Sequence, residues 1–299
     1  MAGLNLGDLP LPPRPFRVDT RTTNRKSGVR FETEEASKKE DLRRASGLQR
    51  TIAKGLLDPD EVSRARRLQS ELALAAKTGI VCDTLASAMA MRCLRIIIAG
   101  HLWKLMRSRC KYTTATVIPR SWEFTPEELA GVDPRSLMAA FRTALYKAGI
   151  QQVSGWLFAY LHGEYDPLAG VFRLHLHIAM TKSMEPVLDR LRLQPNYRST
   201  RYLDDGSPSP VFRRVWIRRK PLTSMPDPVT YVLQSFWPAR PIYFDEDGKR
   251  HRLRQKGAIR EPVHSLVLLW LDRWKVQDLT LMVGLRVTRA GLTPTQTHR

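Results

Sequence analysis

The 299-residue sequence has few cysteines, no long apolar run and a shortage of acidic residues. Its three cysteines, Cys82, Cys93 and Cys110, are too few and too scattered for a disulfide framework or a paired-cysteine metal site. We therefore expect a reducing compartment, the cytoplasm. No run of about eighteen apolar residues exists, so we expect no membrane span. The first residues lack a basic stretch followed by an apolar run, so we expect no secretory signal.

The shortage of acidic residues leaves a strong positive charge. There are 49 Lys and Arg against 29 Asp and Glu, a formal net charge of +20. Such an excess favours a polyanionic partner, most commonly nucleic acid, over a merely solvated basic surface. Apolar residues make up 42% of the chain, which is enough for a core and excludes disorder throughout.

Composition changes along the chain predict four regions. Residues 1–45 are rich in Pro, Arg, Thr and Lys and predict a basic flexible arm. Residues 46–110 carry apolar side chains at helical spacing and predict a helical segment, with a break near Gly100. Residues 111–240 alternate between strand and helix patterns. Residues 241–299 predict a basic extension with one helix, ending in a tail.

The central region predicts an α+β fold. Two strand-like runs, VSGWLFAYLHGEYD and VFRLHLHIAM, are joined by a DPLAG turn and predict a β-hairpin. VFRRVWIRRKPL predicts a further strand, and DPVTYVLQSFW predicts a helix capped by Asp227. We therefore expect an antiparallel sheet of ferredoxin-like type with helices, preceded by the helical segment.

The hairpin carries a candidate metal site. His175 and His177 are alternate residues of one strand, so their imidazoles face the same side and are suited to a divalent metal ion. The alternative is two surface histidines with no ligand. Glu164 and His162 share a face of the partner strand. We expect Glu164 as the third ligand, because a carboxylate lowers the charge of a site that must accept a phosphate oxygen, and His162 is the alternative. A carboxylate beside two imidazoles favours Mg²⁺ or Mn²⁺ over zinc, which would favour thiolates or a third histidine.

Basic residues are concentrated after the hairpin. Between residues 212 and 260 there are twelve Lys and Arg and four Asp and Glu. This pattern predicts a track for a sugar-phosphate backbone, in which Trp216 is a base-stacking platform or, as we expect, part of the core. The residues expected to contact DNA are Arg213, Arg214, Arg218, Arg219 and Lys220.

These residues resemble a known family. HLH at 175–177 resembles the His-hydrophobic-His signature of HUH endonucleases, and KYTTATVIP at 111–119 resembles their first-motif strand. TYVLQSFW at 230–237 is similar to the family's tyrosine helix, so the resemblance implies that Tyr231 is the nucleophile. Tyr243 is the fallback. Gln234 stands where such helices often have lysine, and no second tyrosine follows one turn later, which makes a paired-tyrosine mechanism unexpected.

The resemblance covers about residues 111–237 and is strongest for single-tyrosine rolling-circle replication initiators of bacterial plasmids. It implies a metal-dependent, site-specific single-strand DNA endonuclease and strand transferase with a 5′-phosphotyrosine intermediate. The implied partner is single-stranded or hairpin origin DNA. A host helicase acting in trans is a further candidate partner, because no GxxxxGK[ST] loop is present. Two alternatives stay open: a transposase or relaxase with the same chemistry, and a nucleic-acid-binding regulator that does not cut.

Overall fold

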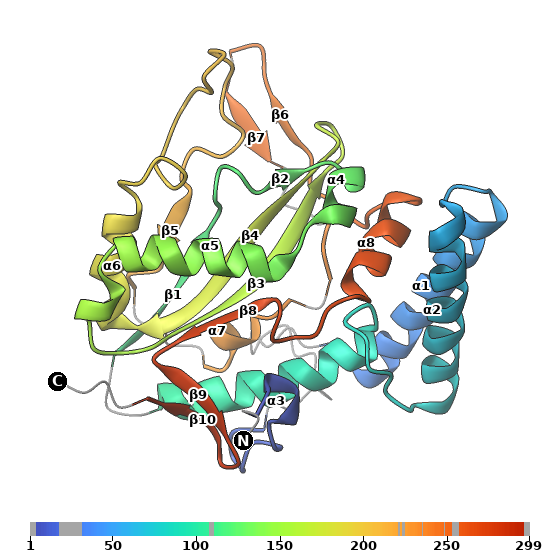
Figure 1. Ribbon diagram of the computed structural model, residues 1–299, viewed down its shortest axis with the longest axis horizontal. Coiled ribbons are helices and arrows are strands. Elements are labelled where there is room, and N and C mark those ends of the chain that lie inside the picture. The colour runs from blue at the N-terminus through green and yellow to red at the C-terminus, as the bar shows by residue number, and fades with distance from the viewer. Residues whose placement is uncertain are drawn as a thin grey trace.

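Over the described residues, the computed structural model is an α+β fold with one large antiparallel sheet and eight α-helices (Figure 1). The described residues are 4–17, 32–107, 111–220, 222, 225–234, 236–247, 249–252 and 257–295. Within them, no helix combines the length and the apolar character that crossing a bilayer requires.

The main sheet has the strand order β5-β1-β4-β3-β8, and the short β2 pairs with β4. Two further pairs of strands, β6–β7 and β9–β10, lie outside this sheet. The strands are β1 Tyr112–Val117, β2 Glu123–Phe124, β3 Leu157–Asp166, β4 Val171–Thr181, β5 Val215–Ile217, β6 Ile242–Phe244, β7 Arg250–Arg252, β8 Thr280–Val283, β9 Leu285–Thr288 and β10 Gly291–Pro294.

The predicted hairpin is confirmed as β3 and β4, which pair along the whole length of β3. Leu174, Leu176 and Ile178 are fully buried and alternate with His175 and His177 along β4. Alternate side chains of a strand point to opposite faces, so these apolar residues and the histidines lie on different faces of the sheet. The strand therefore contributes to the core with one face and presents imidazoles on the other.

Helices pack on the sheet and beside it. In Figure 1, α5 and α6 lie across the front of the sheet, and α1, α2, α3 and α8 form a group at its side and lower edge. The helices are α1 Glu34–Ala53, α2 Pro59–Thr78, α3 Ala88–Met106, α4 Pro126–Gly131, α5 Pro134–Lys147, α6 Glu185–Leu191, α7 Asp227–Thr230 and α8 Val263–Leu271. Helix α5 is amphipathic, and it buries Met138, Phe141 and Leu145.

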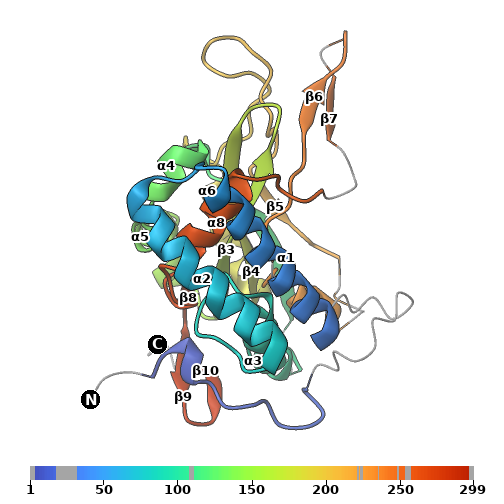
Figure 2. The same cartoon turned by 90° about the vertical axis from the view of Figure 1, so that its right-hand side faces the viewer.

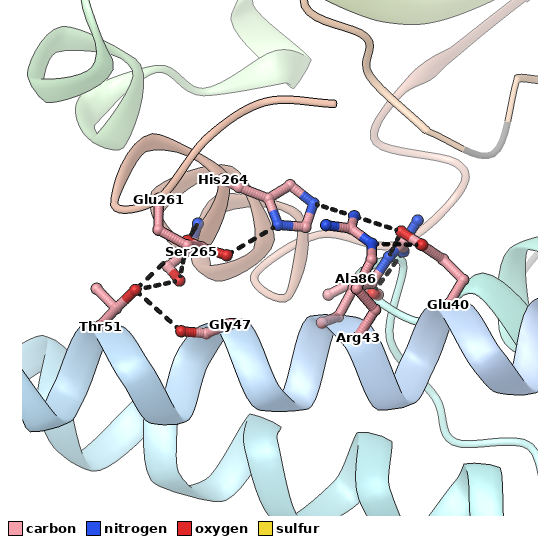
Figure 3. Close-up of polar contacts among 9 residues, drawn as sticks. Glu40, Arg43, Gly47, Thr51, Ala86, Glu261, His264 and Ser265 are labelled. Atoms are coloured by element: carbon pink, nitrogen blue, oxygen red, sulfur yellow. Dashed lines mark hydrogen bonds and ion pairs between the residues drawn. The ribbon is translucent and has the colours of Figure 1, made fainter. Parts of the chain in front are cut away.

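The helical segment is tied to the C-terminal part of the chain by a polar network between α1 and α8 (Figure 3). The Glu261 carboxylate accepts hydrogen bonds from the backbone N–H of Ser265 at 2.9 Å and from its hydroxyl at 2.6 Å. The Ser265 hydroxyl lies 3.0 Å from the Thr51 hydroxyl of α1, and His264 lies 3.3 Å from Glu261. Figure 2 shows α1 and α2 side by side. The segment therefore packs on the rest of the chain through residues far apart in sequence.

This network predicts a loss of stability in acid. Burial alone would raise the pKa of Glu261, but hydrogen bonds from His264 and Ser265 outweigh burial and lower that pKa from 4.5 to about 2. A carboxylate with a depressed pKa stabilises the fold above its unfolded pKa, and this contribution is lost as pH falls from about 4.5 to about 2. We expect the free energy of unfolding to fall by about 1–2 kcal/mol from this group, after allowance for its partial exposure. Glu261→Gln should flatten the acid limb in urea titrations at several pH values, whereas Glu127→Gln at an exposed site of α4 should not. An unchanged acid limb in Glu261→Gln would contradict the assignment.

Several predicted boundaries are wrong. Helix α1 begins at Glu34, inside the predicted flexible arm of residues 1–45. Residues 1–3 and 18–31 of that arm lie outside the described residues. Helix α3 continues through Gly100, where an added Cβ would lie 2.5 Å from Pro12. That glycine therefore permits close packing of the N-terminal segment and does not end the helix.

The C-terminal extension also differs from the prediction. The one helix predicted there is α8, which ends at Leu271, and β8 follows it and joins the main sheet beside β3. The predicted tail forms the β9–β10 hairpin, up to the last described residue, 295. The helix predicted from Asp227 to Trp237 is shorter still, because α7 ends at Thr230 and turns follow it.

Candidate active site

Three histidines meet on the open face of the β3–β4 hairpin. The register pairs His162 of β3 directly with His175 of β4, and His177 lies two residues further along β4. One ligand nitrogen from each ring lies within 4.8 Å of the others. All three residues are buried, with exposed fractions of 8% or less. Rigid strands thus hold three imidazoles in a small space where water is largely excluded.

Backbone carbonyls define the protonation of two of these rings. His162 Nε2 lies 3.0 Å from the carbonyl oxygen of Phe236, and His175 Nδ1 lies 3.2 Å from that of Arg173. A carbonyl oxygen only accepts hydrogen bonds, so each of these nitrogens is the donor and carries a proton. In the neutral form of each ring the remaining nitrogens, His162 Nδ1 and His175 Nε2, bear lone pairs, and they face each other at 3.1 Å.

Two facing lone pairs repel unless a cation or a proton lies between them. Zinc–nitrogen bonds of about 2.0–2.1 Å place two ligand nitrogens of one ion roughly 3.0–3.4 Å apart, and the separation of 3.1 Å between His162 Nδ1 and His175 Nε2 falls within that range. Hydrogen bonds from the outer ring nitrogens to carbonyls are also the usual support of histidine ligands. The residues present therefore fit a divalent metal ion held by His162, His175 and His177.

Glu164 lies apart from this group and faces arginines. It pairs across the hairpin with Arg173, two register steps beyond the His162–His175 pair. Its carboxylate forms ion pairs with Arg240, at 3.1 Å, and with Arg252. Both carboxylate oxygens are thus engaged, and the structure groups His162, in place of the expected Glu164, with the histidine pair. An all-imidazole donor set removes the reason for preferring Mg²⁺ or Mn²⁺ over zinc, because imidazole is a common zinc ligand and the preference rested on a carboxylate ligand.

The segment after α7 is anchored so that the Phe236 carbonyl reaches His162. The indole of Trp237 packs directly over Gly163 of β3, where an added Cβ would lie 2.2 Å from the ring. Trp237 is buried and its ring also contacts Trp270 of α8, with centroids 5.3 Å apart. Glycine at position 163 is thus required for the close approach that aligns the neighbouring histidine.

Tyr231 stands beside the histidine group. It is the C-cap residue of α7, and its ring centroid lies 4.8 Å from that of His177. The residue is 53% exposed, and it lies at the wall of a cavity. Burial lowers the pKa of Arg240, whose guanidinium lines the same cavity as Tyr231. The structure therefore brings together the predicted nucleophile and the predicted histidines.

These groups line one cavity of about 470 Å³. Its walls include the three histidines, Tyr231, Trp216 and four arginines, and Glu164 is the one acidic residue among the described residues that line it. The arginines are Arg173, Arg213, Arg240 and Arg252. Arg173 is neutralised by Asp166, at 2.7 Å, and by Glu123, at 3.3 Å. The cavity is thus electropositive and suited to phosphate groups.

The basic residues predicted to bind DNA have different surroundings. Arg213 is exposed and lines the main cavity, and Arg218 lines a second cavity beside Tyr231. Arg219 is held by Glu185 at 2.9 Å and by Asp189 at 2.7 Å, and Lys220 is exposed beside a third cavity. Arg214 is only 1% exposed and burial lowers its pKa, so it lies beneath the surface and not along a phosphate track.

The structure adds residues that sequence reasoning missed. Arg240 and Arg252 line the cavity and hold Glu164, although they are 76 and 88 residues from it in sequence. Their basic character was visible in the sequence, but no local pattern placed them at the hairpin. Trp216 was expected in the core and is 47% exposed at the cavity wall.

No family model, no curated protein and no solved structure matches this chain.

Proposed function

We propose that the protein is a metal-dependent endonuclease and strand transferase of the HUH type that cuts single-stranded DNA through Tyr231. The observation that carries the proposal is an exposed phenol 4.8 Å, ring to ring, from a buried three-histidine group in one arginine-lined cavity. The resemblance in sequence supports the rolling-circle initiator type within this class, acting on single-stranded or hairpin origin DNA in a bacterial cytoplasm. A transposase or relaxase role would use the same site.

The proposed reaction is a transesterification. The Tyr231 oxygen forms a bond to phosphorus, the bond between phosphorus and the 3′ oxygen breaks, and the electron pair goes to that oxygen, which takes up a proton. The phenolic proton is lost to water. The products are a 5′-phosphotyrosine and a free 3′ hydroxyl, so the bond energy is kept for rejoining or priming.

The residues of the site have separate roles in this proposal. Tyrosine has an ordinary pKa near 10 and needs activation at neutral pH. A bound divalent ion would polarise the scissile phosphate and stabilise the charge that develops there. The three histidines would hold that ion, Arg240 would stabilise the phenolate, and Arg213 would bind a phosphate.

The direction of cleavage tests the proposal. The protein is incubated with a random-sequence pool of single-stranded oligonucleotides and Mn²⁺, with label at either the 3′ or the 5′ end. We expect label on the protein, stable to denaturation, only from the 3′-labelled pool, because the tyrosine keeps the 5′ phosphate of the downstream fragment. DNA binding without any covalent label would favour a regulator that does not cut.

The surroundings of the basic residues predict which of them bind phosphate. Each Lys or Arg that neutralises a phosphate releases counterions, and its loss reduces the slope of log K against log salt by about one. We expect this reduction for Arg213→Ala in fluorescence-anisotropy titrations with single-stranded DNA. Arg219→Ala is the matched control, because Glu185 and Asp189 already neutralise that guanidinium. If Arg219→Ala reduced the slope of log K against log salt as much as Arg213→Ala does, the DNA would contact the side of β5 that lies next to α6.

A further inference from the structure

Trp216 lies on the same face of the sheet as the histidines. It is the central residue of β5, the edge strand, and its register partner is Thr116 of β1, which in turn pairs with His177 of β4. Side chains directly opposite each other on neighbouring strands share a face, so these three residues form a row across the sheet. The flanking residues of β5, Val215 and Ile217, are 1% and 6% exposed.

The exposure of Trp216 is unusual in this chain. Its side chain is 47% exposed, whereas the other six tryptophans are buried or half-buried: Trp103, Trp122, Trp156, Trp237, Trp270 and Trp274. An indole is a large apolar surface that is normally buried or kept for contact with a ligand or partner. Here it stands at the wall of the cavity that contains Tyr231.

Two cavities adjoin this row. The second cavity measures about 390 Å³ and is lined by Arg218 and Asp227, among others. Thr116, His177, Trp216 and Tyr231 line both cavities. A nucleic acid strand that runs from one cavity to the other therefore crosses the row beside the nucleophile, and each cavity has the size of a small-molecule site.

We infer that Trp216 stacks on the base next to the phosphate that Tyr231 attacks, and so selects an unpaired strand at the cleavage point. The inference rests on the proposed function. A base in a duplex is stacked on its neighbours and paired, whereas an unpaired base can lie against an indole. Every base has an aromatic face, so this contact favours single strands over duplexes without selecting a particular base. Trp216 is thus a positioning residue that holds the scissile phosphate in reach of the phenol.

Binding of abasic oligonucleotides tests the inference. The full chain and its Trp216→Ala and Trp216→Phe variants are titrated in chelator, to prevent cutting, with single-stranded oligonucleotides that lack one base at successive positions. We expect Trp216→Ala to weaken binding of the intact strand by about 10- to 100-fold, and Trp216→Phe to retain most of the affinity. At one abasic position, wild type and Trp216→Ala should bind equally.

Tryptophan fluorescence gives an independent readout. Quenching of the wild type by single-stranded DNA should be largely lost in Trp216→Phe and retained in Trp103→Phe, a control at a half-buried indole of α3. Unchanged affinity of Trp216→Ala for every oligonucleotide, or equal quenching in Trp216→Phe, would overturn the inference. If either result is obtained and the adduct still forms on Tyr231, the nuclease proposal stands and only the stacking inference fails. If stacking is observed and no adduct forms with Mn²⁺, the stacking inference stands and the nuclease proposal fails.

Discussion

Replacement of Tyr231 by phenylalanine is expected to lower adduct formation and nicking by at least about 10³-fold, because it removes the attacking oxygen. The change removes only a hydroxyl from a side chain that is 53% exposed, so the fold and the histidine group should be unaffected. Binding of single-stranded DNA in chelator should change less than about threefold, since it depends on the arginines and on Trp216. Denaturing gels with 3′-labelled DNA measure the adduct, and anisotropy measures the binding.

Tyr243→Phe is the matched control for this change. Tyr243 is similarly exposed, at 44%, but it lies on β6 and stacks on His251 with ring centroids 5.2 Å apart. It is not among the described residues that line the cavity. Mass spectrometry of the digested adduct should place the nucleotide on the peptide with Tyr231. An adduct that persists in Tyr231→Phe and is lost in Tyr243→Phe would move the nucleophile to the β6–β7 hairpin.

The elements that contain the site could be predicted where the pattern is local. The strand alternation of His175 and His177, and the Pro and Gly turn before them, are contained in a single hairpin of consecutive residues, and that hairpin is confirmed. Helix α5 also follows a local pattern, because its buried residues Met138, Phe141 and Leu145 recur at helical spacing. Local pattern also predicted a helix from Asp227 to Trp237 that contains Tyr231 and is capped by Asp227, but α7 ends at Thr230 and its N-cap residue is Pro226.

The third histidine shows where local pattern is insufficient. Strand alternation puts His162 and Glu164 on one face, and only the register across the turn decides which of them is level with His175. A shift of register by two residues would keep the same face and exchange the two. The observed register pairs His162 with His175 and Glu164 with Arg173.

The environment of Trp216 was unreadable for a different reason. The alternation of Trp216 with Val215 and Ile217 shows only that the indole lies on the opposite face of the strand from these two residues. Whether that face is covered depends on what packs over β5. In the structure, the strand is at the edge of the sheet and the face is left open to the cavity. The same limit applies to the C-terminal extension, because strand β8 is recognisable only when its partner β3 is in place.

Replacement of His162 by alanine is expected to reduce Mn²⁺ affinity by more than about 100-fold, and Glu164→Gln by less than about tenfold. His162 offers a lone-pair nitrogen 3.1 Å from that of His175, whereas the Glu164 carboxylate is held by Arg240 and Arg252. Loss of a direct ligand costs more than loss of a supporting group, for which reductions of about 10- to 100-fold are typical. His175→Ala and His177→Ala should resemble His162→Ala.

Calorimetric titration of the chain with Mn²⁺ measures this order without reference to activity. His251→Ala is the control for loss of a histidine, because His251 lies on β7 and bonds Asp245 at 2.6 Å, outside the described lining of the cavity. Nicking should follow the same order as metal affinity and should disappear in the wild type with chelator. A larger loss of Mn²⁺ affinity in Glu164→Gln than in His162→Ala would mean that the carboxylate leaves its arginines to bind the metal, and that two histidines and Glu164 form the site. Full nicking in chelator would remove the metal from the mechanism, because the phenol would then attack a phosphate stabilised by the arginines alone.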